Sequence, residues 1–117
     1  MQGELRIYRE PNFKRLRQLI RVTAGNLCYD MPCATLSSSI SSSRWTGLPT
    51  TGSNFADGQV KIAFYAATNC TGNATVLNTS VGEVSNFAQF GMDNAITSIA
   101  VLETSTAMLH ESKDLCK

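Results

Sequence analysis

A short pattern occurs twice in this 117-residue sequence, and the repeat restricts the fold more than any other feature. The first copy reads Leu5-Arg6-Ile7-Tyr8 and is followed by Phe13; the second reads Ile62-Ala63-Phe64-Tyr65 and is followed, at the same spacing, by Cys70. In both copies an alternating strand ends at a tyrosine, and turn-type residues lead to the next apolar position. The repeat therefore predicts two similar β units.

Further strand patterns follow in each copy. They occur at residues 15–22 and about 74–78, then at 27–31 and 83–90, and finally at 43–47 and 97–103. Residues 48–58 form a connector rich in glycine, and residues 105–117 form a tail without a clear pattern. Eight short strands separated by turns predict an all-β protein built as a β-sandwich.

The net charge and the short apolar runs argue against two classes of partner. The net charge is +1, which gives no general attraction to nucleic acid, and no apolar run reaches the roughly 20 residues that a membrane span needs. We therefore expect neither nucleic acid binding nor membrane insertion. The basic residues concentrate in the first copy, where Arg15, Arg17 and Arg21 alternate along one strand. They indicate a solvated strand face or, alternatively, a surface for a protein partner.

The four cysteines, Cys28, Cys33, Cys70 and Cys116, favour disulfides over zinc, because there is no CxxC pair and the chain has one histidine. Four cysteines allow three pairings, which the spacing does not decide. We expect Cys28 to pair with Cys33, since the residues between them include a proline suited to a tight turn. Cys70 would then pair with Cys116 and attach the tail.

Three N-linked glycosylation sequons begin at Asn69, Asn73 and Asn78. Together with the cysteines they favour an oxidising, extracellular setting. No signal peptide is visible after Met1, so we expect a secreted protein whose leader has been removed.

Two sets of residues resemble motifs of the βγ-crystallin family. Tyr8-x4-Phe13-x-Arg15 and Tyr65-x4-Cys70-x-Gly72 are similar to the aromatic corner that opens each Greek key of that family. Asp93-Asn94-Ala95-Ile96-Thr97-Ser98 is similar to its calcium motif. The resemblance implies one domain over residues 1–117, with two Greek keys at about 4–47 and 59–104 forming one sandwich.

The sequence departs from the family pattern in both corners. Arg15 occupies a position where the family has glycine, and a left-handed backbone there would cost on the order of 1 kcal/mol. Cys70 replaces the second aromatic residue of the other corner, and we expect a disulfide to supply the tethering that ring packing normally gives.

The resemblance also implies calcium ligands drawn from both copies. With serine aligned on serine, the first copy reads Ser38-Ser39-Ile40-Ser41-Ser42-Ser43 and lacks the acidic pair. One site would then take Asp93, Asn94, the Ala95 carbonyl and the Ser42 hydroxyl. A poorer second site would take Thr97, Ser39 and the Ile40 carbonyl.

Asp93 is the one carboxylate in the two motifs, so the expected calcium affinity is modest, with a dissociation constant of roughly 10⁻⁵ to 10⁻³ M. The alternative is that Asp93 and Asn94 simply form an Asx-type turn.

No catalytic motif occurs in the sequence, and His110 lies alone in the polar tail. We therefore expect no enzymatic activity. Two functions are left open: a secreted calcium-binding protein with a structural or stress-related role, and a secreted interaction protein such as a toxin, inhibitor or host-directed effector. Arg15, Arg17 and Arg21 projecting together beside exposed apolar side chains would favour the interaction protein, and a calcium titration tests the calcium-binding function.

Overall fold

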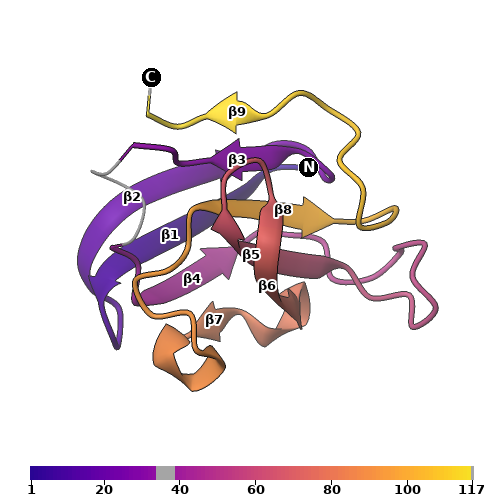
Figure 1. The fold of residues 1–117 in the computed structure, drawn as a ribbon. Coiled ribbons are helices and arrows are strands. Elements are labelled where there is room, and N and C mark those ends of the chain that lie inside the picture. The colour runs from indigo at the N-terminus through magenta and orange to yellow at the C-terminus, as the bar shows by residue number, and fades with distance from the viewer. Residues whose placement is uncertain (34–38, 117) are drawn as a thin grey trace.

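Two β-sheets form the molecule in the computed structural model, which describes residues 1–33 and 39–116 (Figure 1). The first sheet has the strand order β2-β1-β4-β7, with β1 at Gly3–Glu10, β2 at Lys14–Val22, β4 at Ser42–Thr46 and β7 at Glu83–Val84. The second has the order β6-β5-β8-β3-β9, with β3 at Cys28–Asp30, β5 at Lys61–Ala67, β6 at Thr71–Asn78, β8 at Ser98–Leu102 and β9 at Lys113–Asp114. The predicted all-β sandwich is confirmed.

The two copies of the repeat exchange their third strands. β3 of the first copy pairs antiparallel with β8 of the second, and β7 of the second pairs antiparallel with β4 of the first. Each sheet therefore contains strands of both copies, and neither copy can complete its sheet without the other.

The main core lies between the sheets and follows the alternation seen in the sequence. Leu5 and Ile7 of β1 are buried in it, as are Ile62 and Phe64 of β5. Trp45 belongs to the same core, as expected for a structural aromatic. Burial of each such side chain contributes about 1.5–3 kcal/mol to folding.

A second, smaller apolar cluster lies on the other face of the sheet that contains β5 and β8. Ala63 and Tyr65 belong to it, and Phe55 from the connector and Met108 from the tail pack against it. This covering explains why β8 is buried at every position, whereas most half-exposed strands alternate.

Among the described residues, no helix has the length and apolar character needed to cross a membrane.

Some predicted strand bounds are wrong. The strand expected at 83–90 ends at Val84, because Asn86 accepts a hydrogen bond from the Ala88 N–H and starts a 3₁₀ helix, η2, at Phe87–Phe90. A second 3₁₀ helix, η1, spans Thr79–Val81. β6 begins earlier than expected, and β9 arises in the tail that had no pattern.

The two hairpin corners adopt the same unusual backbone. Asn12, Phe13 and Arg15 have φ values of 61°, 61° and 61°, and their counterparts Asn69, Cys70 and Gly72 have 58°, 54° and 78°. The expected left-handed backbone at Arg15 is therefore present. A β-bulge between Ile7 and Tyr8 adds to the irregularity of the first hairpin, and it leaves Leu16 exposed although the alternation placed it on the apolar face.

Replacing Arg15 with glycine is expected to stabilise the protein by about 0.5–1 kcal/mol, because glycine adopts φ of 61° without strain. The exposed ion pair with Glu10 that is lost offsets only part of this gain. Urea unfolding measures the difference. The matched control is Gly72→Ala, which should destabilise, since its Cβ would lie 3.1 Å from the Ala67 Cβ at φ 78°. A lower urea midpoint for Arg15→Gly would contradict this account.

The expected cysteine pairing is wrong. The structure joins Cys28 to Cys70 and Cys33 to Cys116, with Cα separations of 5.8 and 5.9 Å. Cys28 opens β3, whose extended backbone carries the chain away from it, so Cys33 does not return to it by a tight turn. The expectation that a disulfide tethers the second corner holds, with Cys28 as the partner instead of Cys116.

Candidate functional site

The loop between η2 and β8 presents Asp93 and Asn94 to solvent. Asn94 has φ of 56°, a left-handed conformation that asparagine tolerates, and both side chains are exposed. Ile96 is fully buried a little further along and anchors the loop in the main core. The loop is therefore anchored in the core by Ile96 and exposes the polar side chains of Asp93 and Asn94.

The backbone around Ser41 in the first copy corresponds to the backbone around Thr97 in the second copy. The Ser41 N–H donates to the Tyr8 carbonyl at 2.9 Å, and the Thr97 N–H donates to the Tyr65 carbonyl at 2.8 Å. Burial raises the pKa of the Tyr65 phenol above its ordinary value. Ile40 is fully buried, as Ile96 is. Ser41 is therefore the structural counterpart of Thr97.

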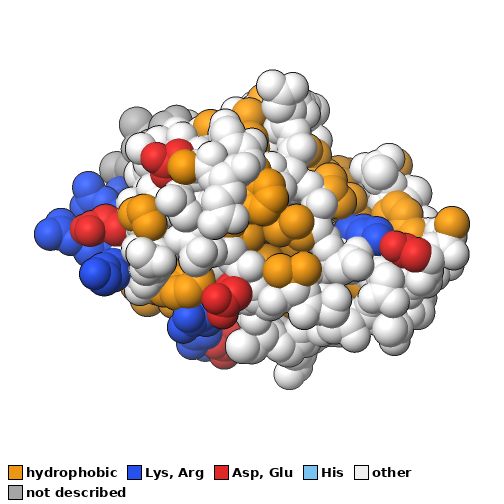
Figure 2. Space-filling view, turned by 90° about the horizontal axis from the view of Figure 1, so that it is seen from below, with side chains coloured by type: hydrophobic (Ala, Val, Ile, Leu, Met, Phe, Trp, Pro, Cys, Tyr) orange, Lys and Arg blue, Asp and Glu red, His pale blue; other side chains and the backbone are white. Residues whose placement is uncertain are grey.

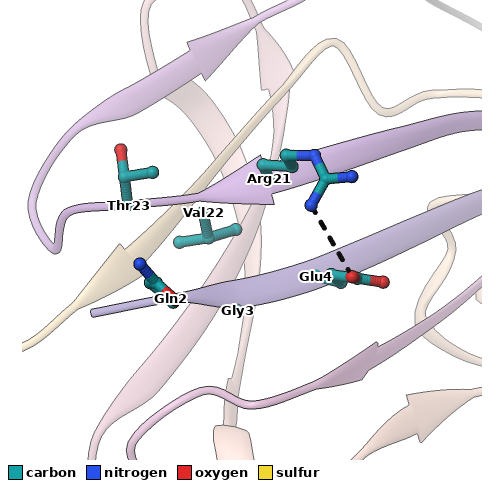
Figure 3. A pocket seen from close by; sticks show the side chains of 6 residues that line it. All are labelled: Gln2, Gly3, Glu4, Arg21, Val22 and Thr23. Carbon is teal, nitrogen blue, oxygen red and sulfur yellow. Dashed lines mark ion pairs between the residues drawn. The ribbon is translucent and has the colours of Figure 1, made fainter.

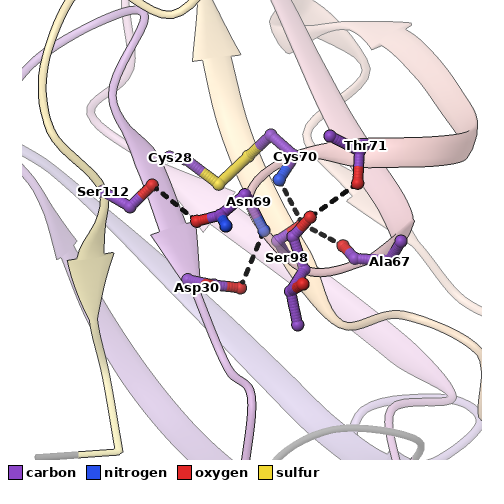
Figure 4. Close-up of a disulfide and its surroundings, with 9 residues drawn as sticks. Cys28, Asp30, Ala67, Asn69, Cys70, Thr71, Ser98 and Ser112 are labelled. Carbon is purple, nitrogen blue, oxygen red and sulfur yellow. Dashed lines mark hydrogen bonds between the residues drawn. A yellow bond between two sulfur atoms is a disulfide. The ribbon is translucent and has the colours of Figure 1, made fainter.

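The next serine in each copy holds the hairpin corner. Ser98 Oγ accepts a hydrogen bond from the Cys70 N–H at 2.9 Å and donates one to the Ala67 carbonyl at 2.6 Å (Figure 4). Ser42 Oγ makes the same two bonds in the first copy, at 3.1 and 2.6 Å, with the Phe13 N–H and the Glu10 carbonyl. Both hydroxyls are fully engaged inside the protein.

This geometry corrects the proposed ligand from the first copy. Aligning Ser43 with Ser98 made Ser42 the calcium ligand, but the alignment is displaced by one residue, and the Ser42 hydroxyl is committed to the corner. In the register of the structure Ser41 occupies the position that the alignment gave to Ser42, and its hydroxyl lies 3.4 Å from Asn94 Oδ1. Sequence reasoning missed Ser41, although the buried Ile40 and Ile96 would have given the correct register.

The residues brought together fit a hard cation. Ser41 and Asn94 supply neutral oxygens, and the adjacent, exposed Asp93 supplies a carboxylate, which is the donor chemistry that calcium prefers. Within the described part of the chain, no group of three His, Cys, Asp or Glu side chains is placed to hold a metal. Any ion here would therefore be held by one carboxylate together with neutral oxygens and water.

The poorer second site is only partly described. Thr97 is half-buried, and the Ile40 carbonyl accepts a hydrogen bond from the Asn94 N–H at 3.0 Å. In the corrected register Ser39 corresponds to Ala95, and Ser37 and Ser38, which correspond to the acidic pair, lie outside the described residues. Coordination by Thr97, Ser39 and Ile40 stays a prediction.

The three arginines of β2 lie at different points along the strand and differ in their contacts. Arg21 lies 3.8 Å from Glu4 beside a cavity of about 320 Å³ at one end of the strand (Figure 3). Arg15 pairs with Glu10 near the hairpin corner at the other end. Arg17 lies between them with its Nε buried and without a hydrogen bond to any described residue. Figure 2 likewise shows basic side chains next to acidic ones on the face that it presents.

Comparison with known proteins shows the fold. No family model and no curated protein matches the sequence. A structure solved for the evolution of the eye lens βγ-crystallin domain fold is 23% identical over 89% of each chain, with a TM-score of 0.57. A βγ-crystallin domain from Flavobacterium johnsoniae is 21% identical over 85% of this chain and 93% of that chain, with a TM-score of 0.56. An archaeal βγ-crystallin is 22% identical over 86% and 98%, with a TM-score of 0.55.

Proposed function

Starting from the βγ-crystallin fold, we propose that this chain is a secreted, non-enzymatic domain that binds one calcium ion weakly and is stabilised by it. The observation that carries the proposal is the approach of Ser41 Oγ to within 3.4 Å of Asn94 Oδ1, which joins the polar loops of the two copies. Asp93, next to Asn94 and exposed, adds the one carboxylate of the site, and the Ala95 carbonyl stays among its proposed donors.

The donor set indicates a weak site. Calcium takes six to eight oxygens, and a site with one carboxylate leaves most positions to neutral groups and water. A dissociation constant of roughly 10⁻⁵ to 10⁻³ M is expected for such a set. An ion that binds the folded state alone stabilises it by about 2.7 kcal/mol at a hundred times the dissociation constant. Extracellular millimolar calcium would therefore stabilise the fold measurably.

Secretion is supported by the two disulfides. They join all four cysteines of the described structure, and Cys28 is completely buried. Such bonds persist in oxidising compartments and are rare in the reducing cytosol. The absence of enzymatic activity is proposed because the fold is shared with βγ-crystallin domains and the sequence carries no catalytic motif.

Asp93→Ala is expected to remove most of the rise in melting temperature that calcium produces, because the ion would then give up water for neutral oxygens alone. Ser41→Ala should weaken calcium binding less, since it removes one neutral donor. Isothermal titration, with thermal unfolding in calcium and in chelator, measures both effects.

Ser42→Ala is the matched control for these variants. Its hydroxyl holds the corner, so the variant should melt lower in chelator but gain as much from calcium as the unaltered protein. Ser39→Ala should change calcium stabilisation little, and Thr97→Ala tests the second site. If millimolar calcium neither binds nor stabilises the protein, or if Ser42→Ala rather than Ser41→Ala loses the response, the proposed site is wrong.

A further inference from the structure

β6 forms an edge of its sheet. The strand spans Thr71–Asn78, pairs with β5 on one side, and contains no charged residue. Val76 in its middle is 50% exposed. Edge strands usually avoid pairing with other chains by carrying lysine, proline or other blocking features. The counterpart strand β2 carries four basic residues, so the repeat itself shows that the fold does not require an uncharged edge here.

The three sequons all lie in or beside this strand, and the structure distinguishes them. Asn69 has a left-handed backbone, accepts a hydrogen bond from the Ser112 hydroxyl at 3.0 Å, and donates its N–H to Asp30 (Figure 4). The middle residue of its sequon, Cys70, is tied to Cys28. Asn69 is exposed, but its side chain and backbone N–H are both engaged in a tight, cross-linked corner.

Asn78 is also engaged. Its Oδ1 accepts a hydrogen bond from Lys61 Nζ at 2.6 Å, and the residue is half-buried at the end of β6. The middle residue of its sequon, Thr79, is buried and donates its hydroxyl to the Pro49 carbonyl. A bulky group on Asn78 would disturb these contacts.

Asn73 differs from both. It lies within β6 and is exposed, as Asn69 is, but unlike the other two its side chain makes no hydrogen bond to any residue that the structure describes. Its neighbours Gly72 and Ala74 are exposed and small, so a large group on its amide meets no side chain there.

We propose that Asn73 carries an N-linked glycan, which shields the uncharged β6 edge. In the transfer, the Asn73 amide nitrogen bonds to the anomeric carbon of a lipid-diphosphate-linked oligosaccharide. The bond from that carbon to the diphosphate oxygen breaks, the lipid diphosphate leaves with the electron pair, and the amide gives up one proton. This inference rests on the proposed secretion but not on calcium binding.

The test expresses the full chain behind a cleavable leader in eukaryotic cells and maps glycopeptides of the total protein by mass spectrometry. We expect a glycan on Asn73, removable by an amidase specific for N-linked glycans, in more than half of the molecules. Asn73→Gln and Thr75→Ala should both lose one glycan from the total, whereas Asn69→Gln and Asn78→Gln should retain the glycan on Asn73. Because the total protein is analysed, retention in the cell would count against secretion without hiding the glycan.

The shielding role is tested on the same material by size-exclusion chromatography over a concentration series. Asn73→Gln should form larger species at concentrations where the glycosylated protein stays unchanged, and adding lysine to the edge as Val76→Lys should reverse this association. An unmodified Asn73 in folded protein overturns the inference. A glycan that leaves association unchanged on removal overturns its shielding role.

Discussion

Replacing Cys28 and Cys70 together by alanine is expected to lower the free energy of unfolding by about 4 kcal/mol, the loop-entropy value for a bond that spans 42 residues. The bond links β3 of the first copy to the corner of the second, so it restricts the unfolded chain across the exchange of strands. Cys28 is completely buried, and alanine avoids leaving an unpaired hydroxyl there. Equilibrium unfolding in guanidinium measures the loss.

The second disulfide provides the control. Cys33 and Cys116 are separated by 83 residues, and loop length alone would assign this bond the larger effect, about 4.5 kcal/mol. The structure predicts the opposite order, because Cys116 lies in the tail, and a tail that detaches recovers entropy in the folded state while both sheets stay paired. A greater loss for Cys33→Ala with Cys116→Ala would show that the tail is integral to the fold.

The sequence predicted the strands that alternate and the two corners, because both are set by local residues. The alternation around Leu5 and Ile7 determines which face of β1 is buried, and the tyrosine that ends each pattern marks the same left-handed corner in the structure. The left-handed backbone at Arg15 could be predicted for the same reason.

The exchange of third strands was not predictable by the same means, and the cysteine pairing depends on it. β3 and β7 are short, and nothing in their residues states which sheet they join. Asp30 illustrates the consequence. Its backbone carbonyl accepts from the Leu115 N–H of the tail, and its side chain accepts from the Asn69 N–H. The residue of the first copy that is equivalent to Asn69 is Asn12, and its N–H donates to the backbone carbonyl of Ser85.

For the candidate site, the sequence indicated the residues of the second copy but not the register of the first copy. Asp93 and Asn94 are distinctive residue types, whereas the facing strand offers a run of serines in which a displacement by one residue changes the ligand and leaves the pattern intact. Strand pairing decides the register: Tyr8 lies opposite Ser42, as Tyr65 lies opposite Ser98.

Asn26 holds the tail to the sandwich, and no sequence pattern indicated this. The residue is 1% exposed. Its Oδ1 accepts from the Glu103 and Thr104 N–H groups at 3.0 and 3.1 Å, and its Nδ2 donates to the Ser105 and Ala107 carbonyls, both at 2.8 Å. All the hydrogen-bonding capacity of one side-chain amide is used in a single buried position.

Asn26→Asp is therefore expected to cost about 3–5 kcal/mol at pH 7, although the two side chains have the same shape. A carboxylate can still accept from the two N–H groups, but it faces the Ser105 and Ala107 carbonyls at 2.8 Å without a proton to donate. This repulsion raises the pKa of the new carboxyl in the folded state above its unfolded value of about 3.9. The contribution of this carboxyl to stability is therefore greatest below that unfolded value and is lost as pH rises through the folded pKa.

Guanidinium unfolding of Asn26→Asp and the unaltered protein at pH 4 and pH 7 measures this prediction, and the difference between them should shrink at pH 4. Asn26→Gly and Asn26→Ala separate hydrogen bonding from backbone strain. Both lose the four bonds, but alanine must also adopt φ of 53°, so it should be less stable than glycine by about 1 kcal/mol. A destabilisation of Asn26→Asp that does not change with pH would mean that the Ser105 and Ala107 carbonyls move away from the new carboxylate. The tail would then be held mainly by the disulfide at Cys116 and not by Asn26.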